Sequence, residues 1–322
     1  MDLYFMTRGL LYLFLPMFGI PGNCTVIWAF LRALHQEGSL LPADAIVLHL
    51  ACANLLVVGV RCVFETLANF QVFNVFNDTG CKSIYFMYRT SRGLSIWLTF
   101  TLSTYQCLSI APPGSVWVTI RSLFGRYLWV IFLVLWVINV SVSGPTAAFA
   151  VAAKNDSKLM ENSINIQFCF IGFPSAYAKD ANGAAQLVRD VIPMSLMTTA
   201  SFIILVFLYR HSQQVKGLRS SVGSGGGGGA SAERRAAFTV VALVTLYVLM
   251  YGVDNGLWVY TLSVRQTLAS PLSSDLRIFF SSLFAAISPI IIITTNTKVK
   301  KQLQFGREEK ASPGPNTNLS KV

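Results

Sequence analysis

Seven blocks of apolar residues, each about 20 residues or longer, constrain the fold of this chain more than any other feature. They fall near residues 9–31, 45–67, 83–110, 127–149, 186–209, 236–261 and 276–297. A helix of about 20 apolar residues crosses a hydrocarbon core of ~30 Å and satisfies its own backbone hydrogen bonds in lipid. The blocks therefore predict an all-α membrane protein, a seven-transmembrane helix bundle.

The charge of the chain fits a membrane protein better than a nucleic-acid-binding one. Only 12% of the residues are charged, although the net charge is +11. With the N-terminus outside, the inner segments hold more lysines and arginines than the outer segments, and such an excess sets orientation. We therefore expect a multi-pass plasma-membrane protein in the lipid bilayer, with an extracellular N-terminus, a cytoplasmic C-terminus and no nucleic-acid partner. About eight residues precede the first block, so no cleavable signal peptide is expected.

The cysteines and the glycosylation patterns mark the outer surface. Four of the six cysteines lie inside spans, where small packing residues are expected: Cys24, Cys52, Cys62 and Cys107. Cys81 and Cys169 lie in outer segments, where oxidation is permitted, and we predict a disulfide between them. Asn77 and Asn155 each begin an N-glycosylation pattern. Asn155 is the better acceptor, because Asn77 lies only a few residues before Cys81.

Two inner segments look unstructured. Residues 211–233 contain the pure glycine tract Gly225–Gly229, natural or engineered, which is typical of a flexible linker. Residues 298–322 are basic and then rich in Pro, Ser and Asn, so we expect a disordered cytoplasmic tail.

Charged residues inside the spans are the strongest pointers to a function. Each arginine near a bilayer centre costs roughly 2.5–3.5 kcal/mol on insertion scales, so such residues usually face a protein interior. Arg89 and Arg92 lie three residues apart in the third block and face nearly the same side of a helix. Arg61 and Glu65 lie four residues apart in the second block, and an internal ion pair is at least as plausible for them as a ligand contact.

Motifs spread over the spans carry a family resemblance. They are His49–Leu56, Cys81-Lys82, Arg89–Ile96, Leu102–Gln106, Ile110–Pro112, Trp136–Asn139, Leu208–Gln213, Glu233–Ala236 and Ser288-Pro289. With these motifs the chain resembles the vomeronasal type-1 receptors, in particular the fish branch called olfactory receptor class A-related. The resemblance implies a G-protein-coupled chemosensory receptor of the rhodopsin-like fold, with no enzymatic activity and no cofactor.

Departures from the commoner rhodopsin-like pattern fit this family. Asn54 stands where that pattern has an acidic residue in the second span, so a sodium-type site lacks its carboxylate. Tyr105-Gln106-Cys107 replaces the Asp-Arg-Tyr triplet, and the Asn-Pro-x-x-Tyr motif of the last span reads Ser288-Pro289-Ile290-Ile291-Ile292.

The outer halves of the spans supply a set of polar and aromatic side chains suited to a pocket for a small organic odorant or pheromone. The candidate ligand-binding residues are Glu65, Tyr85, Tyr88, Arg89, Arg92, Asp190, Tyr251, Asp254 and Trp258. One hypothesis is that Arg89 or Arg92 holds an acidic group of the ligand with its planar guanidinium. The alternative is that both arginines pair with Glu65 and Asp254 and lock helices together.

The inner ends of the spans are expected to part and admit a heterotrimeric G protein. The candidate contact residues are Gln106, Ile110, Tyr209, Arg210, Arg234 and Arg235. Arg234 and Arg235 could equally serve only to set topology.

Other functional classes are weaker. A seven-span small-molecule transporter is the main alternative, but such a protein should show internal repeats, and none is visible. A retinal pump would need a lysine inside the last span, whereas Lys298 lies past its end. A metal site would need clustered ligands, whereas His35, His49 and His211 are isolated.

Overall fold

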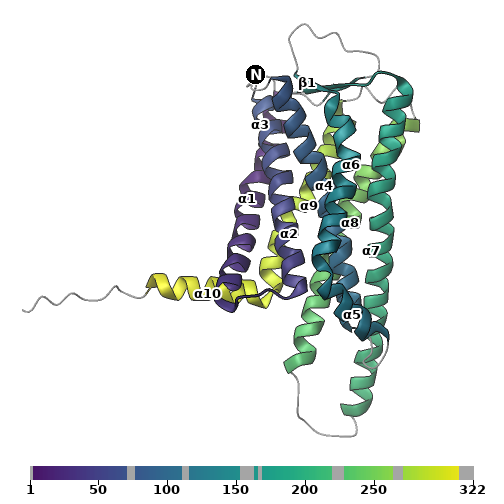
Figure 1. Cartoon of the computed structure of the whole chain (residues 1–322). Coiled ribbons are helices and arrows are strands. Elements are labelled where there is room, and N and C mark those ends of the chain that lie inside the picture. Colours follow the sequence, from purple (N-terminus) through teal and green to yellow (C-terminus); the bar gives the residue numbers. More distant parts are fainter. Residues whose placement is uncertain are drawn as a thin grey trace, which may run out of the picture.

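The computed structural model is a bundle of long helices that run side by side (Figure 1). It describes residues 3–70, 77–110, 116–152, 163–165, 169–219, 228–263 and 271–311. The long helices are α1 (Leu3–Glu37), α2 (Pro42–Val57), α4 (Asp78–Ile110), α6 (Leu128–Ala148), α7 (Ala176–Arg219), α8 (Gly228–Ser263) and α9 (Pro271–Thr295). The second span continues beyond α2 as a π-helical turn, η1 (Val58–Cys62), and a short helix, α3 (Val63–Asn69). Each predicted apolar block thus lies in a helical span of the bundle.

Hydropathy explains most of these helices. Within the described residues, five are long and apolar enough to cross a membrane, and α8 contributes a shorter apolar stretch, Val241–Leu257. Helix α4 is more polar because it lies inside the bundle, where it packs against α2, α6, α7 and α8 instead of lipid. Its buried residues run from Cys81 to Leu108 and include both arginines. Helix α4 is therefore the central helix of the fold.

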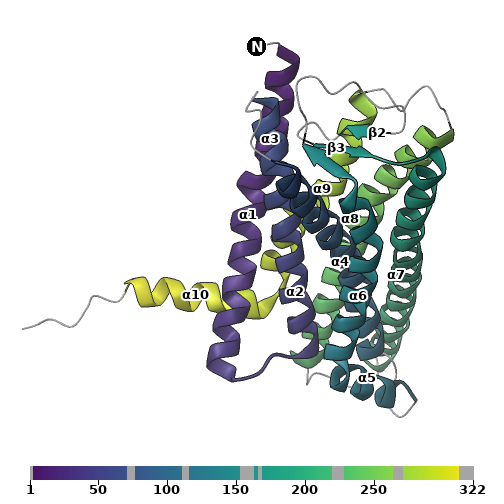
Figure 2. The ribbon, with the colours of Figure 1, turned by 45° about the horizontal axis from the view of Figure 1, so that its top comes forward.

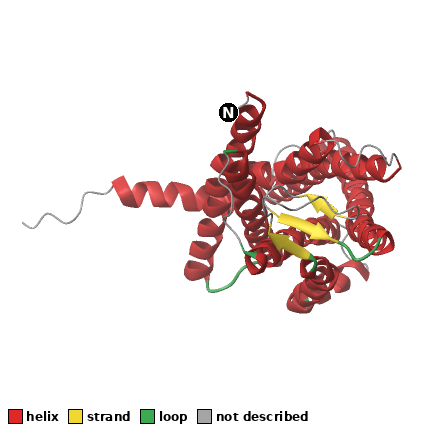
Figure 3. Cartoon of the chain, turned by 90° about the horizontal axis from the view of Figure 1, so that it is seen from above, coloured by secondary structure: helices red, strands yellow, loops and turns green. Residues whose placement is uncertain are grey.

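A small antiparallel sheet covers one end of the bundle. Its strands β1 (Ala150–Ala152), β3 (Cys169–Gly172) and β2 (Ser163–Asn165) pair in that order. Ala150 pairs with Ile171 in one ladder and Ser163 with Gly172 in the other. Seen from above, the strands lie across the ring of helices (Figure 3). We call this end of the bundle the sheet end.

The start of the first described helix and the last described helix lie at opposite ends of the bundle. Helix α1 begins at the sheet end, whereas α10 (Thr297–Ala311) leaves the other end at a steep angle to the bundle (Figure 1). Helix α5 (Val116–Arg126) also lies at that other end, below α6 in the tilted view (Figure 2). This arrangement is expected of an odd number of crossings.

Two predictions of unstructured segments are wrong in part. In the predicted linker 211–233, α7 continues to Arg219 and α8 begins at Gly228, and only 220–227 lie outside the described residues. The predicted disordered tail begins with α10, and 312–322 lie outside the described residues. Asn296 caps α10, since its Oδ1 accepts hydrogen bonds from the backbone N–H groups of Lys298 (2.9 Å) and Val299 (3.2 Å). Val299 is fully buried, so packing stabilises this otherwise polar helix.

Polar contacts in the middle of the bundle join three helices. The side-chain amide of Asn54 donates to Ser288 Oγ (2.9 Å) and accepts from Ser95 Oγ (2.6 Å), which links α2, α9 and α4. All three side chains are buried. Asn54, which stands where the commoner pattern has a carboxylate, thus forms hydrogen bonds with both serines.

Candidate functional site

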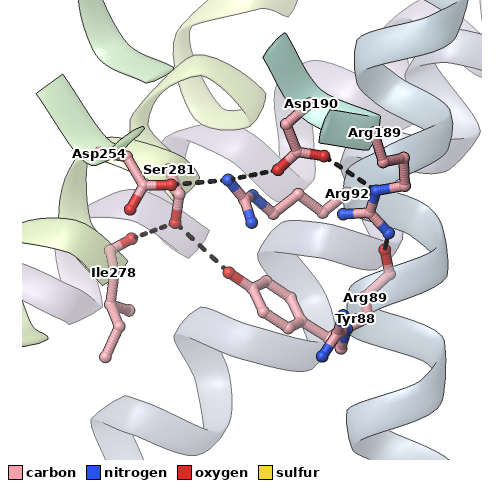
Figure 4. A network of polar contacts seen from close by, with 8 residues as sticks. All are labelled: Tyr88, Arg89, Arg92, Arg189, Asp190, Asp254, Ile278 and Ser281. Atoms are coloured by element: carbon pink, nitrogen blue, oxygen red, sulfur yellow. Dashed lines mark hydrogen bonds and ion pairs between the residues drawn. The ribbon is translucent and has the colours of Figure 1, made fainter. Parts of the chain in front are cut away.

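A buried network of ion pairs lies toward the sheet end, between α4, α7 and α8. Arg92 Nη2 lies 2.6 Å from Asp254 Oδ2 and 3.1 Å from Asp190 Oδ2 (Figure 4). The second oxygen of Asp190 accepts a hydrogen bond from Arg189 Nε at 2.9 Å. All four side chains are at most 5% exposed. Arg92 is therefore a bridge between two carboxylates, one on α7 and one on α8.

Aromatic rings cover the α8 side of this network. The ring centroid of Tyr251 lies 5.2 Å from the Arg92 guanidinium carbon, a cation–π contact. Tyr247 stacks on Tyr251 with ring centroids 4.3 Å apart, and Phe284 of α9 meets both rings edge-on. Helical spacing of Tyr247, Tyr251 and Asp254 along α8 places these groups on one face.

Arg89 lies one turn closer to the sheet and is bonded very differently. Its Nη1 donates to the hydroxyl of Tyr85 (3.1 Å) and to Oδ1 of Asn182 (3.0 Å), both neutral groups. Its Nε and Nη2 are buried without a hydrogen-bond partner, although the residue is only 3% exposed. Among the residues that the structure describes, no carboxylate pairs with Arg89. The amide of Asn182 also donates to Thr146, which fixes its orientation.

The charges of this region do not balance within the described residues. Arg92 and Arg189 offset the charges of Asp190 and Asp254, so that network is neutral. Arg89 adds a further positive charge, and its backbone carbonyl accepts a hydrogen bond from Arg189 Nη1 at 3.4 Å. A buried charge without an oppositely charged partner is costly, and an anion in contact with it would reduce that cost.

Gly93 allows three helices to meet beside the network. A Cβ atom at this position would overlap Oδ1 of Asn139 from α6 and would lie 3.0 Å from the guanidinium carbon of Arg189 from α7. Both side chains are buried against the backbone of α4. The absence of a side chain at Gly93 thus determines how closely α6 and α7 approach the central helix.

A second polar group lies between α1, the second span, α4 and α9. Arg61 Nη2 lies 2.6 Å from Glu65 Oε1, as the spacing of the two residues predicts. The Arg61 guanidinium also lies 5.4 Å from the ring centroid of Tyr88, whose hydroxyl is 3.3 Å from Ser281 Oγ (Figure 4). Glu65 therefore forms an ion pair with Arg61, whereas the helix-locking alternative assigned it to the arginines of α4.

The sheet is tied to the site by a covalent bond and by packing. The predicted disulfide between Cys81 and Cys169 is present, with Cα atoms 5.9 Å apart. It joins the start of α4 to β3. Ile171 of β3 is fully buried and packs with Phe173 against Tyr85, the side chain that bonds Arg89. The sheet thus contacts the Arg89 site directly.

At the other end of the bundle, the predicted G-protein contacts differ in exposure. Gln106 is buried and Ile110 is half-buried in α4, whereas Tyr209 and Arg210 of α7 are exposed. The side chains of Arg234 and Arg235 lie outside the described residues, as does the side chain of Trp258 in the sheet-end set.

The two candidate glycosylation sites differ in what the structure describes. Asn77 is exposed, and its Oδ1 accepts a hydrogen bond from the backbone N–H of Gly80 at 2.8 Å, which caps α4. Asn155 lies outside the described residues.

Sequence and structure comparisons place the chain in a family. The family described as the vomeronasal organ pheromone receptor family matches residues 10–305. The chain belongs to this family. It is 35% identical to the olfactory receptor class A-like protein 1 of Danio rerio over 99% of each chain. This identity confirms the predicted resemblance to the fish branch of the family.

Further relatives and a solved structure agree with this assignment. This vomeronasal-family chain is 28% identical to vomeronasal type-1 receptor 90 of Rattus norvegicus over 89% of this chain and 90% of the relative. The crystal structure of squid rhodopsin superposes with a TM-score of 0.70 at 15% identity, covering 97% of this chain and 88% of the rhodopsin chain. The predicted seven-helix, rhodopsin-like G-protein-coupled receptor fold is confirmed, and the chain is a multi-pass receptor and not an enzyme.

The structure adds two residues to the site that sequence reasoning left out. Arg189 directly precedes Asp190 in the sequence, and this adjacency is the one feature of the sequence that indicates a role for Arg189 in the network. Asn182 precedes the predicted fifth span, 186–209, but α7 begins at Ala176 and brings it to Arg89. No sequence signal marked Asn182.

Proposed function

We propose that the chain is a chemosensory receptor of the plasma membrane that binds a small organic odorant or pheromone at the sheet end and activates a heterotrimeric G protein. Membership of the vomeronasal pheromone receptor family and the rhodopsin-like fold support the receptor class. The polar and aromatic side chains gathered beneath the sheet support a binding site there. In this proposal the sheet end and the N-terminus are extracellular, and α10 is cytoplasmic.

The ligand is an acid, and Arg89 is the group that binds it. This rests on one observation: Arg89 is buried, and two of its three nitrogens lack a hydrogen-bond partner. The ion pairs of Arg92 with two carboxylates support Arg89 over Arg92 for this role. Guanidinium can bind a carboxylate with two parallel hydrogen bonds, and Tyr85 and Asn182 hold Nη1 in a fixed orientation for it.

Binding would signal by shifting a conformational equilibrium, because a ligand favours only the state that it binds more tightly. Arg89, Arg92 and Arg189 connect α4 with α7 and α8 through side-chain and backbone contacts. A carboxylate at Arg89 changes the charge balance of that connection. The helix ends at the opposite side then part for the G protein, along Gln106, Ile110, Tyr209, Arg210, Arg234 and Arg235.

Replacing Asn182→Asp tests the ligand site with minimal change of shape. The new carboxylate would stand where Asn182 Oδ1 now lies 3.0 Å from Arg89 Nη1, so the receptor would neutralise Arg89 by itself. We expect the potency of acidic agonists to fall at least about tenfold in a calcium or GTP-exchange assay, because a charge-assisted hydrogen bond contributes about 1.5–3 kcal/mol. Arg89→Ala should have the same effect.

Asn182→Ala is the matched control, because it removes the contact with Arg89 without adding a charge. It should weaken the response to acids less than Asn182→Asp does, at equal surface expression. Unchanged acid potency in both Asn182→Asp and Arg89→Ala would contradict the acid site. Uptake of the acid into cells without any GTP-exchange response would favour a transporter over a receptor.

A further inference from the structure

Helix α5 is attached to the bundle near its C-terminal end and is otherwise open. The ring of Phe124 packs against that of Tyr105 of α4 with centroids 5.8 Å apart, and a Cβ atom at Gly125 would lie 3.3 Å from Pro42 Cγ of α2. Phe124 and Gly125 are half-buried, whereas the other residues of α5 are exposed. The bundle therefore holds the helix in place but leaves most of its surface for another contact.

The open surface of α5 includes an apolar face. Val116, Ile120 and Leu123 are spaced by four and three residues, which places them on one side of the helix. All three are exposed, Val116 most of all at 73%. Trp117 is also exposed and lies only about 60° from Ile120 around the helix, whereas Ser122 lies on the opposite side. Helix α5 is thus amphipathic, with its apolar side chains turned away from the protein core.

Two arginines border this apolar face. Arg121 and Arg126 lie about 100° and 120° from Ile120, in opposite directions around the helix. Both are exposed, and no carboxylate pairs with either of them in the part of the chain that the structure describes. Helix α5 contains no acidic residue. An arginine at the edge of an apolar face can lay its stem along that face and keep its guanidinium among lipid headgroups.

The start of α6 places α5 at the depth of the membrane surface. Val130 and Leu133 of α6 are exposed apolar side chains, and in a membrane protein these face lipid. Tyr127 and Trp129 are also exposed, and tyrosine and tryptophan gather at the boundary between lipid and water. Arg126, the last residue of α5, directly precedes Tyr127. Helix α5 therefore lies where the lipid-facing surface of α6 ends (Figure 2).

We infer that α5 is a membrane-surface helix: its apolar face enters the headgroup region of the adjoining leaflet, and Arg121 and Arg126 bind anionic lipids there. Burial of the apolar side chains in lipid favours this docking, and the anionic headgroups attract the two arginines. In the orientation proposed above, the leaflet is the cytoplasmic one, which carries phosphatidylserine. Docking itself depends neither on that orientation nor on the proposed chemosensory function.

Spin labels on the two faces of α5 test its depth. The full chain is placed in nanodiscs of equal parts phosphatidylcholine and phosphatidylserine, with one label at Ile120→Cys or at Ser122→Cys, both of which are exposed positions. Oxygen concentrates in the bilayer, whereas a nickel chelate stays in water. The ratio of oxygen to nickel collisions should be several-fold higher at Ile120→Cys than at Ser122→Cys. In the background chain, alanine replaces the free cysteines that are not fully buried: Cys24, Cys52 and Cys107.

The same label measures the contribution of anionic lipid. The two components of the Ile120→Cys spectrum give the equilibrium between docked and free α5. Arg121→Gln and Arg126→Gln should each shift this equilibrium about fivefold toward the free helix, the effect of one basic residue at an anionic surface. Nanodiscs of phosphatidylcholine alone should shift it in the same direction. Lys300→Gln is the matched control, because Lys300 is exposed on α10 and should leave the equilibrium unchanged.

Several results would overturn the inference. Equal collision ratios on the two faces would refute docking, and a lower ratio at Ile120→Cys than at Ser122→Cys would indicate an apolar face that meets a protein partner from the water side. An equilibrium unchanged by both arginine substitutions and by the removal of phosphatidylserine would refute the binding of anionic lipid. A label at Leu123→Cys repeats the depth measurement on the same face, so the result does not depend on one substitution.

Discussion

Two arginines three residues apart in α4 are both buried, yet their partners differ. Arg92 bonds two aspartates, whereas Arg89 bonds a tyrosine hydroxyl and an amide oxygen. Their spacing in the sequence predicts that both face the bundle interior, and both do. It could not predict which one is paired, because that depends on how α7 is rotated and where Asp190 then lies.

This difference predicts that the same substitution destabilises the protein at Arg92 but not at Arg89. Arg92→Met removes the arginine that pairs with both Asp190 and Asp254, and only the pair of Arg189 with Asp190 remains of this network. Removing one partner of a buried ion pair costs about 3–5 kcal/mol. Arg89→Met removes a charge that has no carboxylate partner among the described residues, so the unliganded protein should be equally or more stable. Thermal unfolding of both variants in the same detergent, without ligand, measures the difference. Equal destabilisation would show that Arg89 is neutralised in the empty receptor.

Where the helices meet, small residues and chain length determine the arrangement. Gly19 and Gly22 of α1 let α9 approach closely, since added Cβ atoms would lie 3.0 Å from Ala286 Cα and 2.9 Å from Pro289 Cγ. Hydropathy predicts most of the helical spans, because a helix that faces lipid needs an apolar stretch long enough to cross it, whereas the interior helix α4 is more polar. It does not predict that α7 and α8 extend beyond the apolar blocks, or that α10 forms, because those segments are polar and their folding depends on local capping and packing.

Gly93→Ala should disturb the contact of α4 with α6 and α7. The added methyl group would overlap Asn139 Oδ1 and press on Arg189, and overpacking of this kind costs about 1–3 kcal/mol. Gly252→Ala in α8 is the control, because a Cβ atom there meets nothing within 4 Å and alanine is the better helix former. We expect a lower unfolding temperature and lower surface expression for Gly93→Ala alone. Equal behaviour of the two variants would show that Asn139 can move aside freely.

For the molecule as a whole, the start of α1 and helix α10 lie at opposite ends of the bundle (Figure 1). The family and fold establish a multi-pass membrane protein, and the distribution of basic residues predicts which end faces the cytoplasm. The sequence therefore predicts the fold well, because seven apolar blocks and a set of family motifs allow few other architectures. It predicts the site less well, because the site depends on contacts between side chains far apart in the chain, such as Arg92 and Asp254, which are separated by 162 residues.

Epitope tags at the two ends should be accessible from different sides of the membrane. In intact cells an antibody should reach an N-terminal tag, and a C-terminal tag only after permeabilisation. Asn155→Gln should remove the glycan-dependent part of the electrophoretic shift, whereas Asn77→Gln should change it little, since Asn77 is engaged in capping α4. Both tags on one face would contradict the odd number of crossings.

The π-helical turn Val58–Cys62 has a consequence for comparing this receptor with others. A π turn holds one residue more than an α turn, so it rotates everything beyond it by about 100° relative to an uninterrupted helix. Glu65 and Asn69 owe their inward direction to that extra residue. An alignment with a relative that lacks the turn must open a one-residue gap between positions 58 and 62. Without that gap, the counterparts of these residues would be assigned to the lipid-facing side.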